Sequence, residues 1–394
     1  MGATLWALVL IAGSMTMPAD AASQAPSVSP RVSAACTTSS SPVATTLASM
    51  PPGEATATPA PTVGASPTPD PSAASGTRPR LGGRYVRIAD SPFAPKAGVG
   101  VWTGQIAVIS DALTGRTLAY DPARDRWERL ARSPARIDLA WPVWTGDRMI
   151  VVGDLADDGG IETWAYTPAT DSWNELTDGP LRGHLSSLAW QAGTLAARIS
   201  PPPDDVGIID ADTFAILDEA GRCWRAIESP ASMDVALPGV SGHIVGIAPR
   251  QAQILDPLTG TWSTPIATPV DIREPGLLVG DRVLFLPLAS NEEGTGGWSF
   301  DPATLTWTAV AADCPVWTGY ATAAGSLAVN DAFAFDTDTG TCYRLPRSPV
   351  RHRRDPLRLW LDDRLLVWSG NGGEESPEKR SGYVYLPPTA NGIR

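Results

Sequence analysis

The sequence lacks long stretches of helix-forming residues with a 3.6-residue period, and this absence argues against a helical fold. Basic residues are also in deficit, with 30 Lys and Arg against 42 Asp and Glu. The resulting net charge of −12 argues against nucleic acid or an anionic membrane surface as a partner. The only long apolar run, near residues 5–17, is shorter than the roughly 20 residues that cross a bilayer, so no transmembrane span is predicted.

Residues that carry catalysis or bind metals are scarce. No cysteine pair has the C-x-x-C spacing of a metal site, and neither a Gly-x-Ser-x-Gly motif nor a phosphate-binding loop occurs. The few cysteines and histidines are Cys36, Cys223, Cys314, Cys342, His184, His243 and His352. We therefore assign no catalytic residue, no metal ligand and no cofactor from the sequence.

The first 80 residues differ in composition from the rest. Residues 1–22 combine an apolar run with small residues at Ala19 and Ala21, which is typical of a signal peptide. Residues 23–80 are rich in Ser, Thr, Ala and Pro, have almost nothing to bury, and are predicted to form a disordered linker. This arrangement predicts an extracytoplasmic protein, secreted or associated with the cell envelope.

What the chain has in plenty is Pro (38), Gly (37) and Trp (15), a composition that favours a turn-rich all-β protein. One phrase recurs at intervals of about 35 to 50 residues, the range of repeat architectures. It reads "YDPARDRW" from Tyr120, "YTPATDSW" from Tyr166, "LDPLTGTW" from Leu255 and "FDPATLTW" from Phe300. Degenerate copies run from Asp218 to Trp224 and from Asp336 to Cys342.

The phrase is predicted to be a β-hairpin. Asp accepts hydrogen bonds from backbone N–H groups of the turn, Pro presets φ, and Trp opens the return strand with a large apolar face. The residues expected to have this structural role are Asp121, Trp127, Trp173, Trp224, Asp256, Trp262, Asp301 and Trp307.

A second pair of short strands precedes each hairpin, as in "GVGVWTGQIAVIS" (98–110) and "LAWPVWTGDRMIVVG" (139–153). Each repeat therefore predicts four antiparallel strands, one blade of a β-propeller. The segment 381–388 looks like a third strand with no Trp strand after it, and 84–92 looks like a Trp strand with no hairpin before it. Joined, they complete a seventh blade, which predicts an all-β, seven-bladed propeller over 84–388 with a short tail at 389–394.

These Asp-Pro…Trp hairpins and the "VWTGDRMIVVG" strand pair resemble the kelch family of β-propellers over residues 84–388. Val152-Gly153 matches the start of the family's double-glycine element, whereas Asp154 stands at the second glycine. The resemblance implies a propeller that binds ligands at the mouth of its central channel, where some members of the family use loop arginines for acidic ligands.

Cations recur at one place in the repeat, two to four residues after the Pro that follows each Trp strand. They are Lys96, Arg136, Arg182, Arg273 and Arg351. Guanidinium groups fit carboxylates and phosphates with a bidentate fork, so we expect these residues to bind an anionic small molecule, a glycan or a protein partner. Alternatively, they brace neighbouring blades through Asp138, Asp271 and Asp355, or face water.

Three alternatives for function stay open at this stage. The resemblance also covers sialic-acid mutarotases, which implies acid–base work by groups such as Glu274 or Asp138, and copper radical oxidases, for which His184 and His352 are candidate ligands. The third alternative is a structural cell-surface protein. We expect a monomer.

No disulfide is predicted. Cys314 ends one outer strand and Cys342 begins the next blade's outer strand, so the two are expected at opposite faces, beyond the roughly 7 Å between Cα atoms that a disulfide tolerates.

Overall fold

A computed structural model describes residues 78–95, 98–134, 136–155, 160–176, 183–191, 193–200, 213–217, 224–227, 235–240, 243–248, 250–257, 259–272, 276–286, 297–310, 314–316, 318, 321–370 and 379–388. All of them belong to one compact unit. The predicted signal peptide and linker, and the tail at 389–394, lie outside the described residues.

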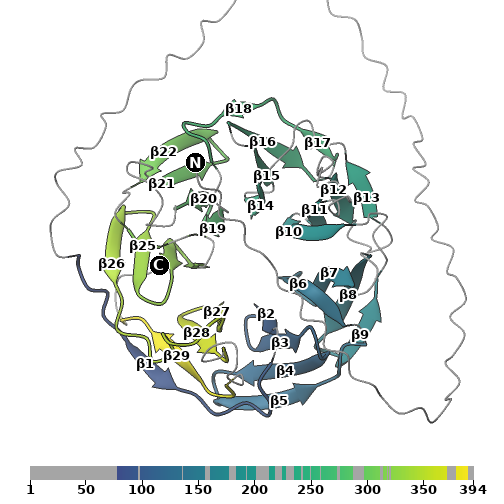
Figure 1. Ribbon diagram of the computed structural model, residues 1–394, viewed down its shortest axis with the longest axis vertical. Helices are drawn as coiled ribbons and strands as arrows, with labels where there is room; N and C mark the ends of the chain where they lie inside the picture. The colour runs from purple at the N-terminus through teal and green to yellow at the C-terminus, as the bar shows by residue number, and fades with distance from the viewer. Residues whose placement is uncertain are drawn as a thin grey trace, which may run out of the picture. The chain divides into compact units, whose positions relative to one another are not determined.

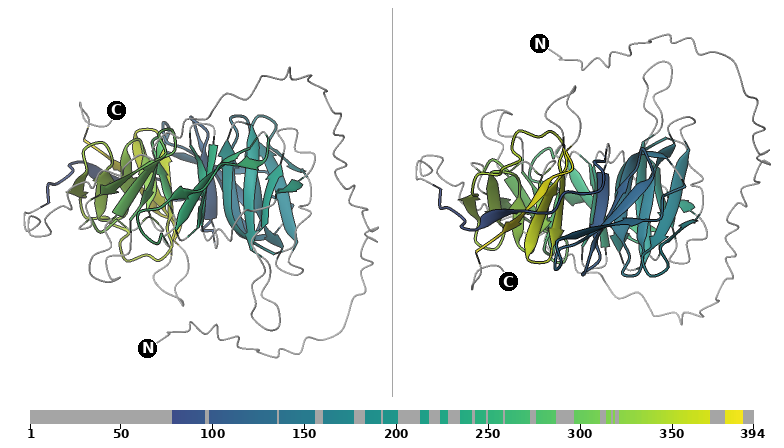
Figure 2. Two further views of the ribbon diagram at one scale, coloured as in Figure 1. Left: turned by 90° about the horizontal axis from the view of Figure 1, so that it is seen from above. Right: turned by 90° about the horizontal axis from the view of Figure 1, so that it is seen from below.

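Seven antiparallel sheets form a ring, as the sequence predicts (Figure 1). The first strand of each sheet contacts the first strand of the next, and the contacts run β2–β6–β10–β14–β19–β23–β27 and back to β2. These inner strands therefore surround the axis, and Figure 2 shows the sheets edge-on, standing side by side around it. The part of the chain that the structure describes contains no α-helix.

Blades 1 to 4 follow the chain in order. Blade 1 is β2 (Gly98–Trp102), β3 (Ala107–Asp111), β4 (Arg116–Asp121) and β5 (Arg126–Leu130), and blade 2 is β6 (Ile137–Trp144), β7 (Met149–Leu155), β8 (Ile161–Thr167) and β9 (Ser172–Glu175). Blade 3 is β10 (His184–Gln191), β11 (Thr194–Ser200), β12 (Thr213–Leu217) and β13 (Trp224–Ile227). Blade 4 is β14 (Val235–Val240), β15 (His243–Ala248), β16 (Gln251–Asp256) and β17 (Thr261–Trp262), with β18 (Ile266–Ala267) also paired to β16.

The remaining blades complete the ring. Blade 5 is β19 (Leu277–Val279), β20 (Arg282–Phe285), β21 (Gly297–Asp301) and β22 (Thr306–Val310). Blade 6 is β23 (Thr322–Ala324), β24 (Leu327–Val329), β25 (Phe333–Asp336) and β26 (Thr341–Arg344). Blade 7 is β27 (Leu357–Leu361), β28 (Arg364–Trp368), β29 (Gly382–Leu386) and, from the other end of the chain, β1 (Arg84–Arg87).

Blade 7 confirms the predicted closure by both ends of the chain. Strand β1 pairs with β29 in register from Arg84 opposite Leu386 to Arg87 opposite Tyr383. Gly83, which leads into β1, has a φ of 100°, and a Cβ there would collide with the carbonyl oxygen of Leu386. Only glycine adopts such a conformation at no steric cost, so this position fixes where the closing strand begins.

The repeated phrase forms the hairpin between the third and fourth strands. In blade 1, Asp121 Oδ1 accepts from the backbone N–H groups of Ala123 and Arg124, at 2.9 and 3.2 Å. Four residues after the Asp or Thr that begins each turn, the backbone has a positive φ and lies in the left-handed region. These residues are Asp125, Asp171, Gly260, Leu305 and Gly340. Since Gly and Asp tolerate this region, the phrase is a turn with a fixed left-handed residue before the return strand.

In blades 1 and 2, the outer hairpin binds the chain that leaves the neighbouring blade. In blade 1, Asp125 accepts from the N–H of Ala89 at 3.0 Å, and Trp127 Nε1 donates to the carbonyl of the same residue at 2.8 Å. In blade 2, Asp171 and Trp173 hold both backbone groups of Ala131 at 2.7 and 3.0 Å. We call this arrangement the indole latch.

A disulfide joins Cys314 and Cys342, with 5.5 Å between their Cα atoms, so the prediction of no disulfide is wrong. The error lay in placing the two cysteines at opposite faces. The end of one outer strand meets the beginning of the next, as Ala131 meets Trp173, and Cys342 stands at the Trp position of the phrase in blade 6. The disulfide therefore stands where blades 1 and 2 have an indole latch. Both cysteines are buried with Leu286, Val316 and Phe335.

Replacing both cysteines by serine should lower the free energy of unfolding by about 3 kcal/mol, because the bond closes a loop of 28 residues in the unfolded chain. Peptide mapping under non-reducing conditions should recover the linked pair, and urea unfolding with and without reductant measures the loss. A map with two separate thiols would contradict the pairing.

The indole latch has a matched internal control. Trp127→Phe removes the hydrogen bond to Ala89 and should cost about 1 kcal/mol more than the loss of ring volume alone. Trp307 packs on Phe300 much as Trp127 packs on Tyr120, with 4.7 Å between ring centroids in both pairs, but its buried Nε1 has no acceptor among the described residues. Trp307→Phe should therefore cost less in urea unfolding, and equal costs would mean that the hydrogen bond contributes nothing.

Candidate functional site

Of the five predicted cations, only Arg136 and Arg351 are among the described residues. Lys96, Arg182 and Arg273 lie outside the described residues, so their gathering at the channel mouth stays a prediction. Arg136 is exposed just before the inner strand β6. Arg351 is exposed on the connection between blades 6 and 7, where it lines a cleft with other arginines.

This arginine cleft has a volume of about 690 Å³ and is lined by Arg80, Leu81, Gly82, Asp331, Ala332, Arg344, Leu345, Pro346, Arg347, Ser348 and Arg351. These residues come from the β24–β25 turn, the end of β26 and the connection that follows it, and the segment before β1. Since β26 is the outer strand of blade 6, the cleft lies at the outer part of the blade 6–blade 7 junction, away from the inner strands.

Two arginines far apart in the sequence meet through the backbone. Arg80 and Arg344 form a parallel β-bridge, in which the Arg344 N–H donates to Pro79 at 2.9 Å and the Leu81 N–H donates to Arg344 at 3.0 Å. The segment before β1 therefore pairs with the free edge of β26. Directly bridged residues bring their side chains close together, so two guanidinium groups share one wall of the cleft.

The cleft has an excess of positive charge. Asp331, the one carboxylate among its described lining residues, already binds Arg358 by two hydrogen bonds, Nε to Oδ1 at 3.0 Å and Nη2 to Oδ2 at 2.6 Å. In the described part of the chain, no carboxylate pairs with Arg80, Arg344 or Arg347. Arg351 Nε lies 3.0 Å from His352 Nε2. Four exposed guanidinium groups can thus bind an anion by donating bidentate hydrogen bonds to it.

Tyrosines of the closing strands lie beside the cleft. Tyr85 of β1 and Tyr385 of β29 have ring centroids 5.2 Å apart, and the Tyr385 hydroxyl donates to the Gly82 carbonyl at 2.6 Å. Burial raises the pKa of Tyr85 to about 12 and that of Tyr385 to about 12 as well. Both phenols therefore stay neutral in the folded protein at pH values where an unfolded chain ionises them.

These raised pKa values predict a loss of stability in alkali. Below about pH 10 both states hold the protons and the contribution is fully present, whereas between about pH 10 and 12 only the unfolded chain ionises. The thermal midpoint should therefore fall across this window. Tyr85→Phe/Tyr385→Phe should make the fall shallower but not abolish it, because burial also raises the pKa of Tyr120 and of Tyr166. The same slope in both proteins would contradict this account.

A buried carboxylate holds an exposed histidine between blades 2 and 3. Asp154 Oδ2 lies 3.0 Å from His184 Nδ1, and Asp154 Oδ1 accepts from the Leu185 N–H at 2.9 Å. The His184 side chain is 54% exposed while that of Asp154 is 6% exposed. The contact orients the imidazole, as an acid–base residue requires. Through its two carboxylate oxygens, Asp154 of β7 also binds two residues of β10, so the contact has a structural role as well.

Most of the arginine cleft was not predicted from the sequence. Arg80, Arg344 and Arg347 fall outside the repeat position that singled out Arg351, and the parallel bridge that brings Arg80 to Arg344 has no sequence signature. A usable signal was the string "CYRLPRSPVRHRR", in which arginines cluster after the last Trp-type strand. Among the structural repeat residues, Asp121, Asp256 and Asp301 end the third strand of their blades. The fourth strands hold Trp127, Trp173, Trp224, Trp262 and Trp307.

Among the described residues, no helix has the length and hydropathy needed to cross a membrane.

No family model matches the chain, and none of the curated proteins matches it. One solved structure that aligns with it, described as "Structure of YjhT", has a TM-score of 0.44 and 14% sequence identity, over 77% of this chain and 98% of that chain. The assignment of the fold as a seven-bladed β-propeller therefore rests on the sheets themselves.

Proposed function

We propose that this protein is an extracytoplasmic, kelch-like propeller that binds an anionic ligand, a carboxylate- or phosphate-bearing small molecule or glycan or an acidic protein segment. The arginine cleft carries the proposal, because Arg80, Arg344 and Arg347 have no carboxylate partner among the described residues in a protein whose net charge is −12. Exposed like charges repel one another, so their accumulation without compensation favours a site that an anion completes.

The geometry suits planar oxyanions. Guanidinium groups present fixed forks to carboxylates and phosphates, and the cleft volume of about 690 Å³ falls in the range of small-molecule sites. The proposal moves the site from the channel mouth, where the repeat position alone would place it, to the blade 6–blade 7 junction. Arg351 belongs both to the cation set predicted from the repeat and to the arginine cleft.

The test is a thermal-shift titration of the full chain with inorganic phosphate, D-glucuronate and a poly-glutamate peptide at low salt. An anion at about 100 times its Kd should stabilise the protein by about 2.7 kcal/mol and raise the melting temperature accordingly. Arg347→Ala/Arg351→Ala should abolish most of that rise, since both side chains are exposed and their removal leaves the core intact.

The matched control is Arg126→Ala/Arg129→Ala, which removes two exposed charges from β5, outside the cleft. This variant should respond to anions as the parent does. If both double variants lose the response equally, the effect is one of net charge and the cleft is not the site. If the parent does not respond at all, the proposal fails.

The second candidate is a carbohydrate-active enzyme, and the observation that favours it is the His184–Asp154 contact. An oriented imidazole with most of its surface exposed could move a proton to or from a sugar hydroxyl. The same titration separates the two functions, because one-dimensional NMR of each stabilising ligand shows whether the protein converts it or only binds it.

A further inference from the structure

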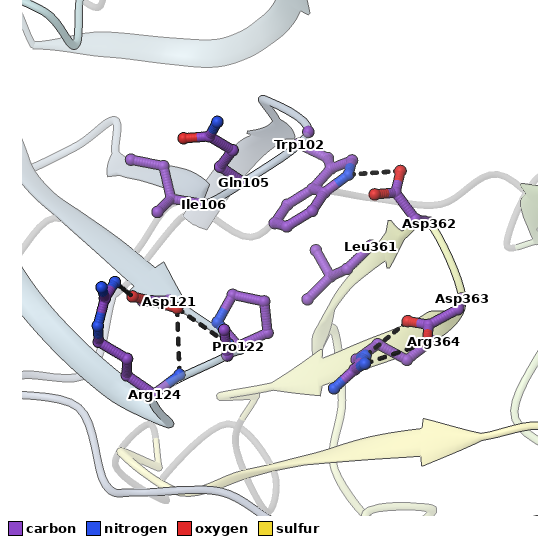
Figure 3. A pocket seen from close by; sticks show the side chains of 12 residues that line it. Trp102, Gln105, Ile106, Asp121, Pro122, Arg124, Leu361, Asp362, Asp363 and Arg364 are labelled. Atoms are coloured by element: carbon purple, nitrogen blue, oxygen red, sulfur yellow. Dashed lines mark hydrogen bonds and ion pairs between the residues drawn. The ribbon is translucent and has the colours of Figure 1, made fainter.

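A second cleft lies on the other flank of blade 7, where it meets blade 1. It has a volume of about 400 Å³ and is formed by the β2–β3 turn, the β4–β5 turn and the β27–β28 turn. It shares no lining residue with the arginine cleft. Figure 3 shows the Trp102 ring above Leu361, with Ile106 to its left, the Asp121–Arg124 pair at the lower left and the Asp363–Arg364 pair at the lower right.

A hydrogen bond and a buried leucine hold the apolar part of this cleft in place. Trp102 Nε1 donates to Asp362 Oδ1 at 2.7 Å, across the junction between the two blades, and this bond fixes the plane of the indole. Leu361 is only 1% exposed, so the cleft has a packed base, while Trp102 and Pro122 are half-buried. A half-buried aromatic ring that is held by its own N–H presents a flat apolar surface at little cost in conformational entropy.

The polar part is neutralised within the cleft. Arg124 Nη1 lies 2.6 Å from Asp121 Oδ2, and Arg364 reaches both oxygens of Asp363, at 2.7 and 3.0 Å. Arg364 holds the pKa of Asp363 below its usual range, so that carboxylate stays charged in ordinary buffers. The described lining residues bring three carboxylates against two guanidinium groups, so they lack the positive excess of the arginine cleft and disfavour anions.

We propose that this cleft binds a neutral carbohydrate of one or two pyranose rings. A sugar ring has an apolar C–H face and a rim of hydroxyl groups, which matches a fixed indole flanked by acceptors and donors. The apolar C–H face of the sugar would stack on Trp102. Its hydroxyl groups would form hydrogen bonds with Arg364 and with the exposed side chains of Gln105 and Asp363. A volume of about 400 Å³ admits such a ligand.

Competing chemistries fit this cleft less well. A nucleotide base could stack on Trp102, but its phosphates would meet the carboxylates of Asp362 and Asp363, which are both exposed. A purely apolar ligand would displace water from these exposed carboxylates and offer no hydrogen bond in return, which is costly. A polyhydroxylated ring can stack its C–H face on the indole and donate hydrogen bonds from its hydroxyl groups to the carboxylates.

The test is binding of the labelled full chain to an array of neutral and acidic glycans, followed by saturation-transfer NMR of the neutral glycans that bind. Trp102→Ala and Asp363→Ala should each weaken binding by about tenfold or more, equivalent to about 1.4 kcal/mol. Asp363 has a side chain 70% exposed, so its removal does not disturb the core. Trp144→Ala is the matched control, since Trp144 faces Met149 in blade 2 as Trp102 faces Ala107 in blade 1, and it does not line the cleft.

Binding of neutral glycans that survives in Trp144→Ala and is lost in both cleft variants supports the site. Binding that is equal in the parent and in Asp363→Ala, or the absence of any neutral glycan among those bound, overturns it. The result is independent of the proposed anion site, because Arg347→Ala/Arg351→Ala should leave neutral glycan binding unchanged. Loss of both activities in that variant would likewise contradict two separate sites.

Discussion

In blades 1 and 2, the ring is held together by hydrogen bonds from the outer hairpin to the chain that leaves the neighbouring blade. A single residue, Ala89 or Ala131, has both its backbone groups satisfied by the next blade, its N–H by an Asp and its carbonyl by a Trp. The same Asp also accepts from the Tyr hydroxyl of its own hairpin, as Asp171 does from Tyr166 at 2.7 Å. Because these hydrogen bonds join backbone of one blade to side chains of the next, they set the spacing between the two blades as well as their attachment. In blade 6 a covalent bond stands in the corresponding place.

The outer hairpin explains which features of the fold could be predicted from the sequence. The phrase repeats because each copy forms the turn between the third and fourth strands of a blade and begins the fourth strand, so the blades can be counted from it. The lone strands at 84–87 and 382–386 were recognisable because each lacked the other half of its blade. The disulfide was missed because the outer strands were treated as running from one face to the other. Cys342, at the Trp position, was the sign that a different contact replaced the indole.

Neither cleft could be predicted in the same way. Arg80 and Arg344 meet only after the ring has closed, and Trp102 bonds to Asp362 across 260 positions of sequence. Such contacts between residues from opposite ends of the chain leave no local pattern. The repeat marked Arg351 because a connecting loop recurs in every blade, but what distinguishes the blade 6–blade 7 junction is the segment before β1, which belongs to no repeat.

The split blade also dictates an order of events when the chain is made. Strand β1 leaves the ribosome first among the strands, yet its partner β29 is synthesised last, so β1 has no sheet to join while the other blades assemble. The pairing of Arg84 with Leu386 closes a loop of nearly the whole folded chain, the slowest kind of contact to form. Until then one edge of the incomplete propeller remains open to other chains, so docking of β1 is the step that ends the period of greatest risk of aggregation.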